Sequence, residues 1–309
     1  MRVFVTGATG VIGRRVVPIL AARGHSVTAA TRTPPSLEQP AVTWVAVDLF
    51  DVDALTHAFA GHDAVINLAT HMPSTTWKML FRSAWRDNDR IRSEGAANVA
   101  AAAHRVGVNI LVQESFALTY PDRGDAWIDE ATDLAPADYN RTVLDAERAV
   151  AGFAQHGGNG VAVRFAAFYG PDAIQVKTYI QALRRGFAGL PGGPDRFISS
   201  VSHDDAAAAA VAAMHAPSGA YNVVDDEPVR RAEYFATLAA ALHLAAPRFL
   251  PGWTTSLFGC VGETMARSLR LSNHKLRSAT DWAPTLASVR EGWRSTVDAM
   301  SCKTADGRA

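Results

Sequence analysis

The fold of this 309-residue chain is decided near its N-terminus, by the stretch Arg2-Val3-Phe4-Val5-Thr6-Gly7-Ala8-Thr9-Gly10-Val11-Ile12-Gly13. Residues 2–6 are typical of a buried β-strand, and a helical pattern follows over about residues 11–23. Three glycines lie between them. Glycines in this place let the backbone turn tightly and approach a pyrophosphate, which the free N–H groups at a helix N-terminus bind. The stretch therefore predicts a dinucleotide-binding βα unit, the alternative being a tight strand–helix turn without a ligand.

Strand-like and helical segments alternate along the first half of the chain. Strands are expected at 2–6, 27–30, 43–47, 63–68, 109–112 and 161–165, and helices at about 11–23, 53–59, 85–106 and 138–155. Strands that alternate with helices of this length predict stacked βαβ units around a parallel sheet. The sequence therefore predicts the α/β class, with a Rossmann-type, doubly wound parallel sheet.

The alternation loosens after Gly170-Pro171, where we expect a smaller, mixed C-terminal lobe. The predicted division is a Rossmann domain over 1–171 that also receives about 197–225, and a substrate-binding lobe over 172–196 and 226–309. An Ala-rich helix over about 204–215 is expected to be capped by an aspartate of the run Ser202-His203-Asp204-Asp205. Trp253, Trp282 and Trp293 are expected in the core of the lobe.

The composition excludes several classes of protein. Hydrophobic residues make up 48% of the chain, which excludes disorder as its main state. Thirty basic and thirty acidic residues give zero net charge, so no overall field attracts nucleic acid or an anionic membrane. Two cysteines are too few for a disulfide framework, and no grouping of residues has metal-ligand spacing. Without an apolar span or a charged leader, we expect a cytoplasmic protein with no metal.

The glycine spacing, Gly-x-x-Gly-x-x-Gly, resembles that of the short-chain dehydrogenase/reductase superfamily. The runs Val163-Arg164-Phe165 and Phe168-Tyr169-Gly170-Pro171 resemble a signature of its extended, epimerase/dehydratase branch, and the resemblance covers nearly the whole chain. It implies a nicotinamide cofactor held by three segments. Their residues are Gly7, Thr9, Gly10, Val11, Ile12 and Gly13 in the glycine loop, Asp48 and Leu49 after the third strand, and Leu68, Ala69 and Thr70 after the fourth.

One residue bears on the choice between NAD and NADP. The acidic residue that binds a ribose 2′-hydroxyl is expected about 20 residues beyond the glycine loop. The second strand ends instead in Thr31-Arg32-Thr33. A guanidinium can pair with a 2′-phosphate through its fork of donors, so Arg32 favours NADP over NAD. The alternative is that Arg32 is a solvated surface arginine.

The catalytic pattern of the superfamily is incomplete in this chain. The resemblance implies a tyrosine that acts as general acid or base and a lysine, four residues later, that lowers its pKa. The run Asp138-Tyr139-Asn140-Arg141-Thr142-Val143 places Tyr139 as the tyrosine and Val143 where the lysine belongs. Tyr139 is a catalytic candidate, the alternative being a tyrosine that packs near the cofactor. Val143 offers neither a charge nor a donor.

The position of the family's serine is also altered. By the spacing of the resemblance, Phe116 takes that position, in the run Gln113-Glu114-Ser115-Phe116 after the fifth strand. Ser115 is one residue early, so a shifted turn is needed to present it; alternatively it is a strand-end hydroxyl. Glu114 is a second candidate acid or base, because sites in α/β proteins gather at the carboxyl ends of the strands. Its alternative is a structural carboxylate.

Two functions of different classes follow. The first is an atypical NADP-dependent enzyme that acts on a small molecule by carbonyl reduction, epimerisation or dehydration, with Tyr139, Ser115 or Glu114 handling the proton. In a variant of it, the cofactor is only a scaffold for a non-redox isomerisation or cyclisation. The second is an NADP-binding sensor or regulator that lacks catalysis. Relatives in the superfamily often form homodimers through the helices that correspond to 85–106 and 138–155, and a homodimer is one of the oligomeric states left open for this chain.

Overall fold

The computed structural model describes residues 1–31, 41–73, 75 and 77–306, and Arg32 therefore lies outside the described residues. A seven-stranded sheet has the order β11-β7-β5-β4-β1-β2-β3, and every neighbouring pair is parallel. Its strands are β1 (Arg2–Thr6), β2 (Ser26–Ala30), β3 (Val42–Val45), β4 (Ala64–Asn67), β5 (Ile110–Phe116), β7 (Asn159–Phe165) and β11 (Gly219–Val223). The prediction of a Rossmann-type fold is confirmed.

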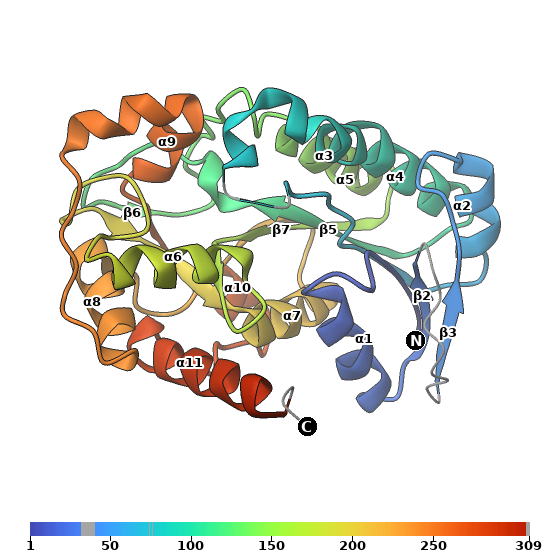
Figure 1. The fold of residues 1–309 in the computed structure, drawn as a ribbon. Coiled ribbons are helices and arrows are strands. Elements are labelled where there is room, and N and C mark those ends of the chain that lie inside the picture. Colours follow the sequence, from blue (N-terminus) through green and yellow to red (C-terminus); the bar gives the residue numbers. More distant parts are fainter. Residues whose placement is uncertain (32–40, 74, 76, 307–309) are drawn as a thin grey trace.

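Helices cover both faces of this sheet (Figure 1). One layer holds α2 (Val52–Phe59), α3 (Arg86–Arg90), α4 (Ala96–Arg105) and α5 (Val143–Gln155), and the opposite layer holds α1 (Gly13–Ala22), α7 (His203–Ala212) and α10 (His274–Ala279). Alternate residues of one strand serve the two layers, since Val3 and Val5 pack toward α1 whereas Phe4 packs toward α2. All three are fully buried, as expected for a parallel strand covered on both sides.

A second lobe lies beyond the carboxyl ends of the strands, at the left of Figure 1. It contains α6 (Ile174–Arg184), α8 (Arg231–Ala241), α9 (Gly259–Ala266) and α11 (Val289–Asp306). Three short strand pairs support it: β8 (Ala167–Tyr169) with β10 (Ser200–Ser202), β9 (Phe197–Ile198) with β12 (Val229–Arg230), and β6 (Trp127–Ile128) with β13 (Arg270–Leu271). Its aromatic core includes Trp293, which contacts Tyr169 and Tyr234.

The other two tryptophans differ from the prediction. Trp253 is 69% exposed and lies in the 3₁₀ segment η6 (Gly252–Phe258). Trp282 is buried, but it packs with the core beneath the large sheet, and its indole N–H donates to the carbonyl of Asp205. Only Trp293 lies in the core of the lobe.

Two of the predicted helices are interrupted, and a third is capped differently. The segment 85–106 divides into η2 (Arg82–Trp85), α3, a π-helical turn η3 (Ile91–Gly95) and α4. Helix α5 begins at Val143 rather than near 138, because hydrogen bonds across three residues form successive turns over Ala137–Asp145. Helix α7 is capped by the hydroxyl of Ser202, which accepts from the N–H of Asp205, and not by an aspartate.

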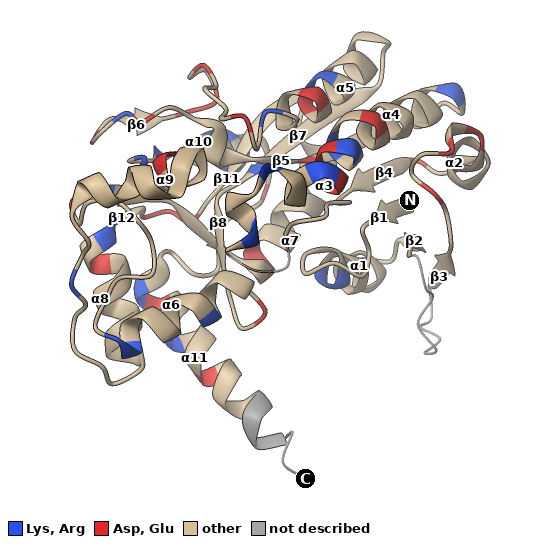
Figure 2. Cartoon of the chain, turned by 45° about the horizontal axis from the view of Figure 1, so that its top comes forward, with Lys and Arg blue, Asp and Glu red and all other residues tan. Residues whose placement is uncertain are grey.

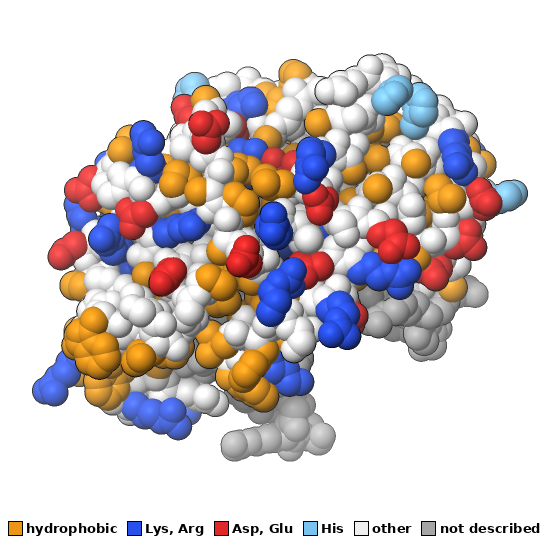
Figure 3. All heavy atoms as spheres, turned by 90° about the horizontal axis from the view of Figure 1, so that it is seen from above, with side chains coloured by type: hydrophobic (Ala, Val, Ile, Leu, Met, Phe, Trp, Pro, Cys, Tyr) orange, Lys and Arg blue, Asp and Glu red, His pale blue; other side chains and the backbone are white. Residues whose placement is uncertain are grey.

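The remaining 3₁₀ segments are η1 (Lys78–Leu80), η4 (Ala117–Thr119) and η5 (Ala213–His215). Charged residues of both signs are interspersed over the helices in Figure 2 and over the face shown in Figure 3, in keeping with the zero net charge. Within the described ranges, none of the helices combines the length and the apolar character that crossing a membrane requires.

Candidate active site

The glycine loop has a backbone that only glycine accepts. Gly7 has φ +63°, and a Cβ on it would lie 2.5 Å from the carbonyl oxygen of Leu68. A Cβ on Gly13 would lie 2.2 Å from the carbonyl oxygen of Gly7, so α1 could not pack this closely on the loop. Around Gly10 there is open space apart from one contact with the loop itself. The predicted tight turn is therefore present.

The end of α1 next to this loop suits a bound anion. The first turn of a helix leaves its N–H groups without intrahelical partners, and the dipole favours negative charge there. No described side chain caps α1, whose N-cap residue is Ile12. Gly7, Gly10, Val11, Ile12 and Gly13 line a cavity of about 350 Å³. These residues fit the pyrophosphate of a dinucleotide.

The other predicted cofactor residues divide into two groups. Leu68 and Thr70, which follow β4, line the same cavity. Among described residues, Thr9, Asp48, Leu49 and Ala69 are not part of its lining. Asp48 accepts a hydrogen bond from the N–H of Phe50, and Leu49 packs against the core beneath α2. Their roles toward a cofactor stay a prediction.

Hydrogen bonds between side chains fix the carboxyl ends of three central strands at the cavity. The hydroxyl of Thr6 in β1 donates to Asn67 in β4, and the Asn67 amide donates to Gln113 in β5 over 2.8 Å. All three side chains are buried. The sheet edge from which the loops emerge is therefore held rigidly, and side chains one residue further along have fixed positions.

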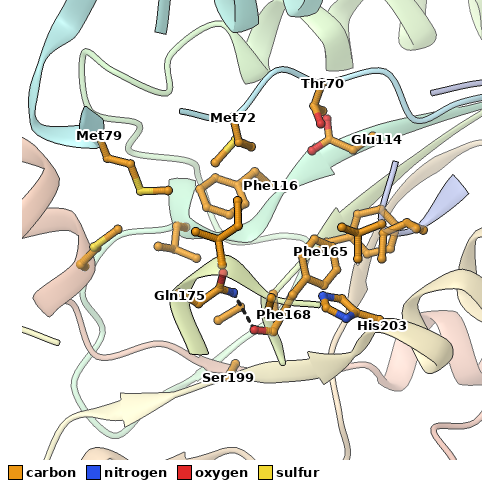
Figure 4. A pocket seen from close by; sticks show the side chains of 18 of the residues that line it. Thr70, Met72, Met79, Glu114, Phe116, Phe165, Phe168, Gln175, Ser199 and His203 are labelled. Carbon is orange, nitrogen blue, oxygen red and sulfur yellow. Dashed lines mark hydrogen bonds between the residues drawn. The ribbon is translucent and has the colours of Figure 1, made fainter. Parts of the chain in front are cut away.

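The cavity extends from the glycine loop into the second lobe, and its wall is mostly apolar (Figure 4). The side chains of Phe116, Phe165 and Phe168 lie around it, with Met72 and Met79 on the side of η1. Phe116 thus brings a phenyl ring to the position where the resemblance implies a serine. An apolar body of small-molecule size fits such a wall.

Tyr139 lies in the turns before α5, not within a helix, and it lines the cavity. It is 2% exposed and packs against Trp85, with 4.8 Å between the ring centres. Its hydroxyl makes no hydrogen bond to any described residue. Burial raises the pKa of Tyr139 to about 12, and nearby Thr264 acts in the opposite direction. Val143, which is fully buried at the start of α5, takes the place of the family's lysine and provides no ammonium group there.

Ser115 is not brought together with Tyr139. Its hydroxyl donates to Glu147 of α5, and the same carboxylate receives two bonds from Arg164, at 2.8 and 2.7 Å. Arg164 also donates to the hydroxyl of Tyr120. Ser115 is outside the lining of the cavity among described residues, and this buried network ties β5 to β7 and α5. The geometry favours the structural alternative for Ser115.

Glu114 does lie at the cavity, beside Thr70 in Figure 4. Its Oε1 accepts from Nη2 of Arg92 over 2.6 Å. Arg92 comes from the π-helical turn η3 and is 2% exposed, and it also lines the cavity. No sequence pattern pointed to Arg92, because an arginine inside a long helical pattern is usually a surface residue.

His203, at the start of α7, is a second lining residue outside the catalytic candidates from the sequence. A Cβ on Gly170 would lie 2.5 Å from its Nδ1, so the glycine of the Tyr-Gly-Pro run makes room for the ring. Burial lowers the pKa of His203 to about 4, so the imidazole is neutral near pH 7. Asp204 pairs with Arg15, and Asp205 accepts hydrogen bonds from Thr285.

A metal centre finds no support in the described part of the chain, where no three histidine, cysteine, aspartate or glutamate residues are grouped to hold an ion. The two cysteines, Cys260 and Cys302, are exposed and unpaired there. Polar and charged side chains that line the cavity include Thr70, Tyr139, Asp172, Gln175, Ser199, His203, Arg231, Thr264, Arg267 and the pair formed by Arg92 and Glu114.

Comparisons with known proteins agree with this geometry. The model of a family described as NAD(P)H-binding matches residues 7–217. A 3-diazoavenalumate denitrifying reductase from Streptomyces sp is 34% identical, over 94% of this chain and 99% of its own length. A 2-alkyl-3-oxoalkanoate reductase from Shewanella oneidensis is 28% identical, over 86% of this chain and 73% of its own length.

Two solved structures share the fold at lower identity. The human epimerase family protein SDR39U1 (isoform 2), solved with NADPH, has a TM-score of 0.78 and 22% identity, over 96% of this chain and 99% of its own. The UDP-glucose 4-epimerase of Thermus thermophilus, solved with NAD, has a TM-score of 0.76 and 24% identity, over 97% and 99%. These likenesses establish the architecture of both lobes.

Proposed function

This chain belongs to the NAD(P)H-binding family, within the extended, atypical short-chain dehydrogenase/reductases, and from that premise we propose that it is an NADP(H)-dependent reductase of a small, largely apolar molecule. The observation that carries the proposal is the single cavity that joins the glycine loop to the apolar wall of Phe116, Phe165 and Phe168. A nucleotide on the loop and a substrate in the lobe would meet there.

The residues of the loop suit NADPH, which supplies a hydride when it is bound. The N–H groups at the start of α1 would hold the pyrophosphate, and Leu68 and Thr70 would flank the rest of the cofactor. The preference for NADP rests on the sequence, where Arg32 rather than an acidic residue follows β2. Each of these residues binds or orients, and none of them moves a proton.

The proton chemistry of the site favours a particular class of acceptor. A tyrosine whose pKa is about 12 is a weak acid, and in this chain no lysine at position 143 lowers that pKa. We infer an acceptor that needs no proton from Tyr139 as it is reduced. A cationic nitrogen electrophile such as a diazonium group meets this condition, because its positive charge is already present. The Streptomyces relative is named for a diazo compound.

Binding of the nucleotide is the first test. We expect the purified protein to bind NADPH more tightly than NADH in a titration of nicotinamide fluorescence. The variant Arg32→Ala should narrow that gap, whereas Arg23→Ala, a change at the other end of the α1–β2 unit, should leave it unchanged. Equal affinities of the unaltered protein for both nucleotides would contradict the preference for NADP.

Turnover is the second test, measured as NADPH oxidation at 340 nm above the protein-free rate. Benzenediazonium and benzaldehyde serve as acceptors of similar size that differ in their need for an acid. We expect faster turnover of the diazonium salt. Tight nucleotide binding without turnover of either acceptor would instead favour the second candidate function, a nucleotide sensor, which the absence of a lysine also fits.

A further inference from the structure

Arg92 and Glu114 form a polar pair in the cavity wall, where Thr70 and Phe116 also lie. Nη2 of Arg92 donates to Oε1 of Glu114 over 2.6 Å. The rest of the pair is unused: Nε and Nη1 of Arg92, and Oε2 of Glu114, are buried without a hydrogen-bond partner in the described ranges. The pair thus presents spare donors and a spare acceptor at one place.

Unused groups of this kind call for a physical explanation. Buried polar atoms in folded proteins nearly always have partners, and leaving a charged donor unpaired in an apolar surrounding costs free energy. Ion-pair partners inside a core usually satisfy all their polar groups through neighbours. Arg164 and Glu147, which join the adjacent Ser115, do so. A ligand that supplies the missing partners would explain why Arg92 and Glu114 leave theirs open.

The backbone holds both residues in place from two directions. Glu114 is part of β5, next to Gln113, which is fixed by Asn67. Arg92 is carried by the π-helical turn η3, and π-helical turns occur frequently at functional sites. On the same segment, Arg90 pairs with Glu94 at the surface, and both are about half exposed. Arg92 in η3 and Arg90 at the end of α3 thus form a buried and an exposed arginine, each paired with a glutamate.

The charges of the pair limit what it can bind. The carboxylate of Glu114 neutralises Arg92, so the pair carries no net charge that would select an anion. Spare N–H donors beside a spare carboxylate oxygen complement a neutral group that both accepts and donates a hydrogen bond. The surrounding wall, with Phe116 5.8 Å from the guanidinium carbon, complements an apolar or aromatic body.

We propose that the Arg92–Glu114 pair binds a hydroxyl group on the substrate, and that the substrate of the reductase is an aromatic molecule that carries a phenolic or alcoholic hydroxyl. The inference rests on the proposed function and names its substrate class. Arg92 donates to the hydroxyl oxygen, and the hydroxyl donates to Oε2 of Glu114. Both residues are positioning residues, since the reaction itself takes place at another part of the substrate.

Three probes of one size test this assignment by isothermal titration, with the protein saturated with NADP⁺ and again without nucleotide. 2-Naphthol donates and accepts, 2-methoxynaphthalene only accepts, and 2-naphthoate is an anion. We expect 2-naphthol to bind about tenfold more tightly than 2-methoxynaphthalene, because the ether leaves Oε2 unpaired. Equal binding of these two probes, or tighter binding of 2-naphthoate than of 2-naphthol, would overturn the proposal.

Variants of Arg92 and Glu114 test whether this pair causes the preference for 2-naphthol over 2-methoxynaphthalene. Arg92→Gln and Glu114→Gln should each reduce the tenfold preference to about twofold or less while leaving the Kd for NADPH unchanged. The matched control is Arg90→Gln, which removes the exposed arginine at the end of α3, two residues before Arg92, and should keep the full preference. If Arg92→Gln does not fold, Glu114→Gln, which keeps the size of the side chain, decides the question. A preference that survives in Glu114→Gln would contradict the role of Oε2.

The outcome of these binding measurements does not depend on whether the proposed reductase function is correct. The preference for 2-naphthol is read without turnover and in the absence of nucleotide, so it can hold in a protein that reduces nothing. A protein that reduces benzenediazonium but shows no preference among the probes would keep the proposed function and lose this inference.

Discussion

The two edges of the cavity differ in how closely they follow the family pattern. At the β1–α1 edge, Gly7, Gly10 and Gly13 have the expected spacing, and Gly7 and Gly13 have the expected close packing. At the β5–α5 edge, Phe116 and Val143 stand where the resemblance implies a serine and a lysine. One end of the cavity is thus built to hold a nucleotide, whereas the other lacks the usual groups for proton transfer.

The two edges depend on different features of the chain. The loop depends on backbone geometry, which tolerates no side chain at Gly7. Proton transfer depends on individual side chains that can be exchanged while the fold persists. The buried pair of Arg92 and Glu114 shows that the altered edge is not simply apolar, because polar groups occur there in a different place.

The largest effect is expected at the glycine loop. Gly7→Ala puts a Cβ 2.5 Å from a backbone oxygen and strains a positive φ, so we expect NADPH affinity to fall about 1,000-fold, roughly 4 kcal/mol. Fluorescence titration measures the affinity, and circular dichroism checks that the variant folds. The matched control is Gly24→Ala, which also has a positive φ but has open space around it. A folded Gly7→Ala protein with unchanged affinity would contradict the loop's role.

The β5–α5 edge is tested by placing a lysine at position 143, where the resemblance implies one. Val143 is fully buried, so in Val143→Lys an ammonium group would lose its hydrating water. We expect the free energy of unfolding to fall by about 3–5 kcal/mol. Chemical denaturation measures it against Val143→Met, which is long but uncharged. A Val143→Lys protein as stable as Val143→Met, with faster turnover of benzaldehyde, would show that the site still accommodates the family's lysine.

The buried imidazole of His203, in the cavity wall, should make the stability of the protein depend on pH. Its pKa is lowered to about 4 by burial, from a usual value near 6.5, so the unfolded chain takes up a proton first as the pH falls. Stability is therefore fully present above pH 6.5 and is lost as the pH falls toward 4, by roughly 2–3 kcal/mol. Denaturation at a series of pH values checks this. His203→Gln should flatten the slope, whereas His215→Gln, at an exposed site, should leave it unchanged.

The smallest effect is expected for Tyr139→Phe. The hydroxyl is buried without a hydrogen bond in the described part of the chain, so its removal should change the free energy of unfolding by less than about 0.5 kcal/mol. Turnover of the diazonium acceptor should stay within about threefold. Because the pKa is about 12, the rate should not depend on Tyr139 between pH 6 and 9. A fall of about 100-fold in turnover would identify Tyr139 as the proton donor. The β5–α5 edge would then follow the family pattern in this respect, as the β1–α1 edge does.

Much of the fold could be predicted because it depends on local patterns. The positions of β1, β2, β4 and the glycine loop follow from apolar runs and turn residues that are close in sequence. The Rossmann class needed only the alternation of strands and helices. The beginnings of helices were predicted less well, and α5 starts at Val143 because the preceding turns have hydrogen bonds of a type that helical periodicity does not reveal.

The candidate site likewise has features that the sequence predicts and features that it does not. By itself, the sequence determined the nucleotide loop, the absence of the lysine and the phenylalanine at the serine position, because each is a statement about which residue stands at a counted spacing. Only the tertiary structure decided that Ser115 joins Glu147, that Tyr139 is buried, and that Arg92 meets Glu114. Arg92 and Glu114 are 22 residues apart, on a π-helical turn and a strand, and whether such side chains meet depends on how the helix packs across the sheet.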